Sequence, residues 1–356
     1  MKLLHSADWH LDSPIYGRTQ EQSDLLRAAL LQLPHKIVAA AKAESCDLML
    51  LSGDLFDGPS TPESVQALKT ALKEAQIPVF ISPGNHDFVG ASSPWLTEVW
   101  PENVHIFTSR TVESVSIPKL NCRVYGAAFT AMEDAGLLEN FQICGDEHWH
   151  LGVFHGDPTI AASPYGPITA EQVRSSGLSY LALGHIHKGG SFQAGSTLCA
   201  WPGCPMGRGF DELDIKGVNI VTLEDGCASR FLPLDTPRFY DWELEAGNDA
   251  AATLSSHLPG AASADFYRIT LTGESEPIDL EALQGQFSQF PNLQLRDRTV
   301  PPMDLWASIG SDTLEGAYFG MLQQAMEGAD PETCRKIALA ARISRQLLDG
   351  REVKLP

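Results

Sequence analysis

The sequence predicts a layered α/β protein with two or three domains. From Met1 to about residue 235, short apolar stretches alternate with helix-like stretches, and after that point a shorter strand–helix–strand–helix–strand run follows. Alternation of this kind is typical of sheets and helices packed in layers. A chain of 356 residues can bury a large core and exceeds one typical domain.

Seven apolar segments in the first part predict buried strands. They are residues 2–7, 47–53, 78–84, 103–107, 122–128, 150–156 and 179–185. We expect a helix that begins behind Pro34 and another over residues 62–75, with Thr61 as its N-cap and a proline at its first position. Thr169 opens a TAEQ capping box, which predicts a third helix.

The later part of the chain predicts two further pieces. We place the first domain at residues 1–235, a small α/β domain at 236–300, and a helical tail at 301–356 that opens with two prolines. In the last helix, Ile337, Ala341 and Leu348 fall on one face and Arg335 and Arg342 on the opposite one. The simplest interpretation is a helix that packs on its own body and leaves a basic face in solvent.

Composition excludes some functional classes. The residues are 43% hydrophobic and 20% charged, and no apolar run reaches the ~18 residues of a membrane helix. A net charge of −20 disfavours a generic basic nucleic-acid binder, although bound divalent cations would reverse the local field. The seven cysteines form no CxxC pair, which favours free thiols in a reducing, cytoplasmic compartment without a signal peptide.

Polar side chains follow five of the predicted strands. Neutral imidazole, carboxylate and amide oxygen are ligands of divalent metals, and no thiolate joins them. Each motif alone fits an ordinary turn or strand end, but all five meet at the edge where sites assemble in α/β sheets. They predict a site with two metals and a bridging carboxylate. The residues concerned are Asp8, His10, Asp54, Asp57, Asn85, His86, Asp87, His155, His185 and His187.

The order DWH, GDLFD, GNHD, HG and GHIH over residues 1–210 resembles that of the calcineurin-like metallophosphoesterases. HSADWHLDSP, WPGCPMGRGFDE and KGVNIVTLE resemble the bacterial DNA-repair exonuclease branch, with its SbcD-type and YhaO-type members. This resemblance implies a β-sandwich core flanked by helices, a small α/β capping domain and a helical tail. In that branch the tail docks a coiled-coil ATPase of the SMC-like type.

The resemblance also implies a role for each site residue. One metal would be held by Asp8, His10 and His187, the other by Asn85, His155 and His185, with Asp54 between them. His86 would contact the scissile phosphate and assist the leaving oxygen, and Asp87 would orient or charge-balance His86 as a carboxylate partner. Some relatives carry a histidine directly after GDLF, where this chain has Asp57.

The function expected from this resemblance is a DNA exonuclease that uses two Mn²⁺ ions, acts 3′–5′, and has an endonuclease activity as a second expectation. Its expected partners are single- or double-stranded DNA ends, an SMC-like ATPase and a second copy of the chain. One alternative is a phosphatase or phosphodiesterase for nucleotides or other small phosphoesters, which the acidic charge favours. The other alternative is a non-catalytic scaffold that binds DNA ends or an ATPase.

Overall fold

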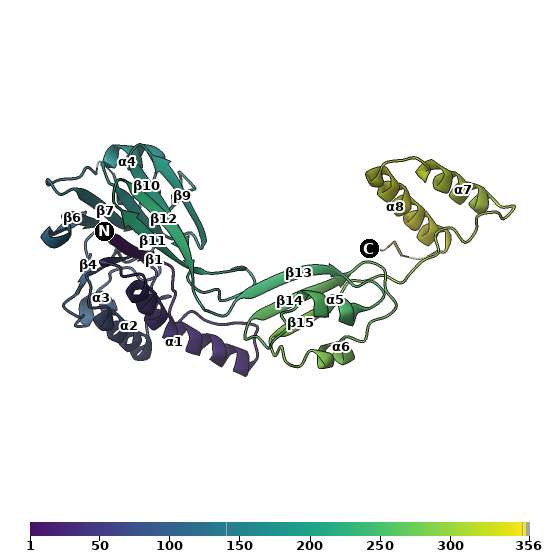
Figure 1. Cartoon of the computed structure of the whole chain (residues 1–356), viewed down its shortest axis with the longest axis horizontal. Coiled ribbons are helices and arrows are strands. Elements are labelled where there is room, and N and C mark those ends of the chain that lie inside the picture. The colour runs from purple at the N-terminus through teal and green to yellow at the C-terminus, as the bar shows by residue number, and fades with distance from the viewer. Residues whose placement is uncertain (140, 351, 354–356) are drawn as a thin grey trace. The chain divides into compact units, whose positions relative to one another are not determined.

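The computed structural model describes residues 1–139, 141–350 and 352–353. Its chain forms two compact units, Met1–Phe239 and Tyr240–Pro356. The first unit is built on two six-stranded sheets, with α1 and α2 together on one side and α4 on the opposite side (Figure 1). The division into three parts at residues 235 and 300 stays a prediction.

One sheet of the first unit has the strand order β12–β11–β1–β2–β3–β4. The strands β1 to β4 run parallel, β11 pairs antiparallel with β1, and β12 pairs antiparallel with β11. Their bounds are β1 (Lys2–Ser6), β2 (Leu48–Leu51), β3 (Val79–Ile81), β4 (Val104–Ile106), β11 (Gly217–Leu223) and β12 (Cys227–Pro233).

The second sheet has the order β5–β6–β7–β8–β10–β9. Its four central strands are parallel, and β5 and β9 pair antiparallel at the edges. The bounds are β5 (Glu113–Ile117), β6 (Cys122–Gly126), β7 (Trp149–His155), β8 (Tyr180–Gly184), β9 (Lys188–Ala194) and β10 (Thr197–Gly203).

The main core of the first unit is formed by residues from both sheets. Leu3 and Leu50 of one sheet and Val124 and Val153 of the other are fully buried in one cluster. Inward-facing residues of two sheets that share one core define a β-sandwich. The layered α/β fold predicted from the sequence is therefore confirmed, and all seven predicted strands are present.

The helices of the first unit agree with the predictions except at the start of α1. α1 begins well before Pro34, because Thr19 and Gln22 form a capping box, and it continues through the buried proline. Thr61 caps α2, and Thr169 caps α4, as expected. The bounds are α1 (Gln20–Ala43), α2 (Pro62–Ala75), α3 (Pro94–Thr97), the 3₁₀ helix η1 (Pro118–Leu120) and α4 (Ala170–Ser176).

The second unit contains a three-stranded sheet in the order β13–β14–β15, together with helices that include α5 and α6. Leu254, Ile269 and Leu283 lie in its apolar core. None of the helices in the described residues is both long and apolar enough to cross a membrane. The bounds are β13 (Phe239–Glu245), α5 (Ala250–His257), β14 (Phe266–Thr272), α6 (Leu280–Gln286), β15 (Leu293–Asp297), α7 (Leu314–Met326) and α8 (Pro331–Leu348).

The face of α8 that is buried differs from the predicted one. Ala341 is buried as expected, but so is Arg342, which is 3% exposed and pairs with Glu274. Leu348, placed on the inward face, is 59% exposed. The prediction of a solvated basic face is therefore wrong at Arg342, because an ion pair allows its guanidinium to be buried.

Candidate metal centre

The loops after β1 and β2 are joined by backbone hydrogen bonds. The N–H of Asp8 donates to the carbonyl of Gly53 at 3.0 Å, and the N–H of His10 donates to that of Asp54 at 2.9 Å. Asp8, His10 and Asp54 have left-handed backbones, with φ of 57°, 48° and 51°. Residues other than glycine seldom adopt this conformation, and such strain is concentrated at functional sites. The two loops therefore hold three predicted ligands in fixed positions.

The loop after β3 can approach Asp54, in the loop after β2, closely because residue 84 is a glycine. A Cβ atom on Gly84 would lie 2.2 Å from Oδ1 of Asp54, so a larger residue would displace that carboxylate. The same Oδ1 accepts a hydrogen bond from the backbone N–H of His86 at 2.9 Å. Asp54 is therefore clamped between two loops, with its side chain almost entirely buried.

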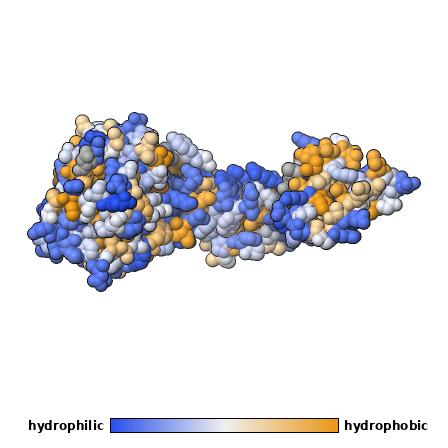
Figure 2. Space-filling view, turned by 90° about the horizontal axis from the view of Figure 1, so that it is seen from above, coloured by the Kyte–Doolittle hydropathy of each residue, from blue (hydrophilic) through white to orange (hydrophobic). Residues whose placement is uncertain are grey.

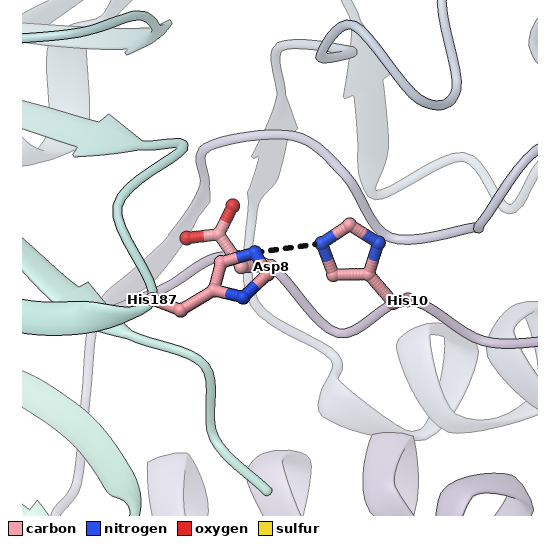
Figure 3. Close-up of side chains that lie close together, drawn as sticks. All are labelled: Asp8, His10 and His187. Atoms are coloured by element: carbon pink, nitrogen blue, oxygen red, sulfur yellow. Dashed lines mark hydrogen bonds between the residues drawn. The ribbon is translucent and has the colours of Figure 1, made fainter. Parts of the chain in front are cut away.

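Asp8, His10 and His187 converge on one point, as Figure 3 shows. The Nε2 atoms of the two histidines are 3.0 Å apart. Oδ1 of Asp8 accepts the backbone N–H of His185 at 2.9 Å, but the buried Oδ2 has no hydrogen-bond partner among the described residues. A buried carboxylate oxygen without a partner is costly, and a cation would satisfy it. These three residues could hold one metal ion.

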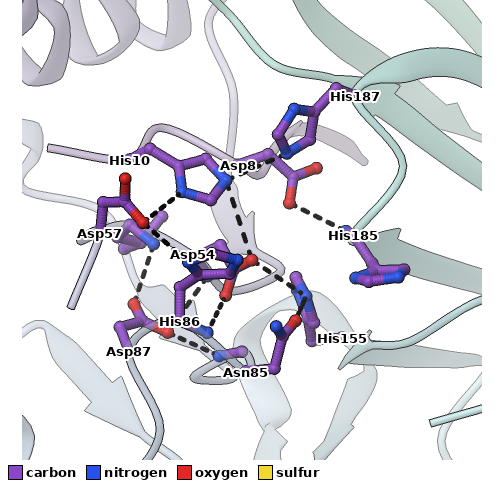
Figure 4. A network of polar contacts seen from close by, with 12 residues as sticks. Asp8, His10, Asp54, Asp57, Asn85, His86, Asp87, His155, His185 and His187 are labelled. Carbon is purple, nitrogen blue, oxygen red and sulfur yellow. Dashed lines mark hydrogen bonds and ion pairs between the residues drawn. The ribbon is translucent and has the colours of Figure 1, made fainter. Parts of the chain in front are cut away.

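Asp54, Asn85 and His155 form a second cluster beside the first (Figure 4). Nδ1 of His155 donates to the carbonyl of Ser52 at 2.8 Å, so Nε2 faces Oδ1 of Asn85 at 3.0 Å and Oδ2 of Asp54 at 3.3 Å. Burial lowers the pKa of His155, but the Asp54 carboxylate outweighs burial and raises this pKa to about 9. The arrangement therefore favours a positive charge, which a proton or a metal ion could supply.

His185 lies next to this second cluster without joining it closely. Its ring packs edge-on against His155, with centroids 5.3 Å apart, and lies 5.2 Å from the ring of Tyr165. No group of three close ligand atoms among the described residues includes a nitrogen of His185. Of the seven predicted ligands, six are thus brought into contact, and His185 is adjacent to them.

His86 is oriented by Asp57, not by Asp87. Nδ1 of His86 lies 2.7 Å from Oδ1 of Asp57, and this hydrogen bond raises the pKa of His86. The contacts with His10 and His86 hold the pKa of Asp57 well below its usual range. The side chain of His86 is 43% exposed. The prediction that Asp87 orients His86 is therefore wrong, because Asp57 makes that contact. Charge balance by Asp87 stays a prediction.

Asp87 instead fastens two loops together. Its carboxylate accepts the backbone N–H groups of Gly84 at 2.7 Å, Leu55 at 2.8 Å and Asp54 at 3.2 Å. These donors belong to the loops after β2 and β3, so the buried Asp87 holds the backbone that carries Asp54 and Asn85. These hydrogen bonds fit a structural role for Asp87, whose carboxylate holds the loops that carry the proposed metal ligands.

Two further residues of the site had no predicted role. Oε1 of Glu212 lies 2.7 Å from Nδ1 of His187, which directs the opposite nitrogen, Nε2, toward His10. Arg208 donates to Glu212 from its backbone at 2.9 Å and from Nε at 3.1 Å. Partners of this kind fix the orientation of metal-binding imidazoles. The sequence signal that could have identified these two residues is their spacing, because Arg208 and Glu212 stand four positions apart in GRGFDE.

Three of the curated relatives place the chain among known proteins. The uncharacterized metallophosphoesterase YhaO of Bacillus subtilis (strain 168) is 33% identical over 322 residues, which cover 82% of this chain and 76% of that protein. The SbcD component of the nuclease SbcCD from the same strain is 26% identical, over 64% of this chain and 67% of its own length. The DNA double-strand break repair protein Mre11 of Aeropyrum pernix is 24% identical, over 68% of this chain and 63% of its own length.

The family assignment rests on a separate match. The sequence model described as calcineurin-like phosphoesterase matches residues 1–189, which include all of the candidate metal centre except Arg208 and Glu212. That match and the similarity to YhaO show that this chain belongs to the calcineurin-like phosphoesterase family.

Proposed function

We propose that the chain is a Mn²⁺-dependent phosphodiesterase that cleaves DNA, as a 3′–5′ exonuclease with an additional endonuclease activity. The observation that carries this proposal is the convergence of His and Asp side chains from five strand ends beside the partly exposed His86. Two relatives are named as a nuclease and as a DNA repair protein, which supports DNA as the substrate. Calcineurin-like phosphoesterases bind two divalent metals, and this metal centre would serve the same reaction class.

We assign one ion to Asp8, His10 and His187, and the other to Asn85, His155 and His185, with Asp54 shared. The unpartnered Oδ2 of Asp8 and the 3.0 Å approach of the Nε2 atoms of His10 and His187 support the first set. For the second, the atoms of Asn85, His155 and Asp54 face one another. The proposed ligand set has no thiolate, which favours Mn²⁺ over Zn²⁺.

The two cations would acidify a water molecule and offset charge on the phosphoryl oxygens. The chain's own contribution to the chemistry centres on His86. Nδ1–H of His86 is held by Asp57, so Nε2 is the nitrogen available to a substrate. The raised pKa keeps more of the ring protonated near neutral pH, which suits a group that contacts a phosphate and donates a proton to the leaving oxygen.

We further propose that residues 236–300 cover DNA and that residues 301–356 dock an SMC-like ATPase partner. The tail helices expose several large apolar side chains, which gather over part of their surface (Figure 2). Leu314 is 89% exposed, Met321 71% and Leu347 62%. Exposed apolar side chains that cluster in this way are typical of protein interaction sites. A homodimer remains a prediction.

The test is hydrolysis of labelled single- and double-stranded DNA by the purified chain with Mn²⁺, beside bis(p-nitrophenyl) phosphate and a nucleoside monophosphate. The proposal expects shortened DNA products, and DNA binding that weakens steeply between low and moderate salt because counterions are released. Hydrolysis of the small esters alone would favour a small-phosphoester enzyme. Binding of DNA without any hydrolysis would favour a scaffold. Asp54→Asn serves as the inactive control.

A further inference from the structure

Residues 203–212, called the 203–212 segment, hold the backbone of the proposed metal ligand His187. The N–H of Cys204 donates to the carbonyl of His187 at 3.2 Å. A Cβ atom on Gly203 would lie 2.5 Å from the same carbonyl oxygen, so this close approach requires a glycine, whose φ is 78°. Residues outside the range 1–189 that matches the family therefore help to place a proposed ligand.

Within this segment, Glu212 and Arg208 fix the side chain of His187. Oε1 of Glu212 accepts the Nδ1–H of His187 at 2.7 Å, and Glu212 is only 6% exposed. Arg208 donates to Oε2 from its backbone and from Nε, so the buried carboxylate keeps a positive partner. A carboxylate on one imidazole nitrogen makes the other a stronger metal donor. Nε2 of His187 is thus strengthened at the atom that faces His10 (Figure 3).

The same segment also holds the loop after β1, which carries His10. Nη1 of Arg208 donates to Oγ of Ser13 at 3.2 Å, and the backbone N–H of Ser13 donates to the carbonyl of His10 at 3.1 Å. Further along this loop, the guanidinium of Arg18 lies over the ring of Phe210, 4.9 Å from its centroid. Two strand ends that are far apart in the sequence are therefore joined through one segment.

Arg208 and Glu212 contact the ligands of one proposed ion. Their hydrogen bonds reach His187 directly and His10 through Ser13, and both histidines belong to the first ligand set. Within the part of the chain that the structure describes, no hydrogen bond joins the pair to a proposed ligand of the second ion. The pair is therefore placed to act on the two ions unequally.

We infer that the 203–212 segment positions the ligands of the first ion, and that Glu212 sets the affinity for this ion through His187. Ligands that are already oriented bind a cation without a further loss of side-chain freedom, so the segment strengthens the binding of that ion. This inference rests on the ligand sets of the proposed function and adds the residues that control one of them.

The test is isothermal titration of the metal-free chain with Mn²⁺, in which His187→Ala marks the binding phase of the first ion. Glu212→Gln removes the charge and should weaken that ion about 10- to 100-fold, with the second ion unchanged. Glu212→Asp keeps the charge but draws the carboxylate back by one methylene, so it should also weaken the first ion. Glu212→Asp guards against misfolding of Glu212→Gln, and denaturant unfolding in EDTA shows whether each variant is folded.

A second measurement separates positioning from a general effect on the fold. ¹⁵N NMR of the metal-free chain, labelled on histidine, should find the proton of neutral His187 on Nδ1 in the wild type. An amide can accept a hydrogen bond from Nδ1–H or donate one to Nδ1, so Glu212→Gln should give a mixture of both tautomers.

Glu147→Gln is the matched control, because Glu147 pairs with Arg123 at 2.8 Å and precedes β7, whereas His155 ends that strand. It should leave both affinities and the His187 tautomer unchanged. Wild-type affinity for the first ion in either folded Glu212 variant would overturn the inference, and so would an unmixed Nδ1–H tautomer in Glu212→Gln. A wild-type chain that binds no Mn²⁺ would instead overturn the proposed metal centre.

Discussion

Nδ1 of His86 lies 2.7 Å from Oδ1 of Asp57, so the carboxylate after the GDLF segment orients the histidine of the GNHD segment. The two residues come from the loops after β2 and β3, and the bond joins groups 29 positions apart in the sequence. The position directly after GDLF is thus occupied by an acidic partner for His86.

Asp57→Asn should lower turnover about 10- to 100-fold, because an amide still accepts a hydrogen bond but no longer stabilises a charged imidazole. The metals should remain, since Asp57 lies outside the proposed ligand set. Steady-state hydrolysis and metal analysis of the same preparation check both statements. Wild-type turnover in the variant would show that Asp57 does not position His86.

His86→Asn should retain both metals, the fold and DNA affinity, while turnover falls by ~10²–10⁴, the usual contribution of a positioned proton donor. The half-exposed side chain of His86 makes the change tolerable to the fold. Metal analysis and single-turnover kinetics are the measurements. Loss of a metal would identify His86 as a ligand, and full turnover would remove its role in the reaction.

Asp87→Ala should destabilise the first unit by about 3 kcal/mol or more, because three buried backbone N–H groups lose their acceptor. Denaturant unfolding in EDTA measures the difference without a contribution from bound metal. His86→Asn, a change at the neighbouring residue, is the control and should unfold like the wild type. An unchanged free energy of unfolding in Asp87→Ala would contradict the structural role.

His5 should make stability depend on pH. It is buried in the first unit, where Nδ1 accepts the Tyr180 hydroxyl at 2.8 Å and Nε2 donates to the carbonyl of Leu183 at 3.1 Å. Burial lowers the pKa of His5 to about 3. The unfolded state, with a pKa of about 6.5, takes up the proton first. Stability contributed by neutral His5 is therefore complete above pH 6.5 and is lost as the pH falls toward 3.

The effect should reach on the order of 5 kcal/mol once both states are protonated. His5→Gln should flatten the fall in unfolding free energy between pH 6.5 and 3, measured in EDTA, whatever its effect on absolute stability. His257→Gln on the exposed end of α5 is the control and should keep the wild-type slope. Equal slopes in all three proteins would refute the assignment.

The sequence was sufficient to predict strands where a run of apolar residues coincides with burial on both faces of the strand. The strands that the sequence predicts are apolar runs, so their positions and the polar residues that follow five of them were predictable. β5 and β9 are half-exposed edge strands without such a run, and they were missed. The strands β10, β11 and β12 were missed as well. The capping box at Thr19 marks the true start of α1, but the proline inside the helix obscured it.

Side-chain partners were less predictable than ligand positions. Asp87 is adjacent to His86 in sequence, yet Asp87 turns back to backbone N–H groups and Asp57 arrives from another loop. Only the three-dimensional path of the left-handed loops decides between the two carboxylates. The burial of Arg342 could not be predicted either, because it depends on a pair with Glu274 from the loop that follows β14.

The most direct test of the binuclear metal centre is the metal content of the wild type and of Asp54→Asn after purification with Mn²⁺. Asp54 lies between the two clusters, 3.3 Å from Nε2 of His155 and 3.8 Å from Nε2 of His10, so a bridge of lower charge should hold less metal. We expect two ions per wild-type chain, and one or none in Asp54→Asn together with lost turnover. Two ions per chain and wild-type turnover in Asp54→Asn would contradict this expectation.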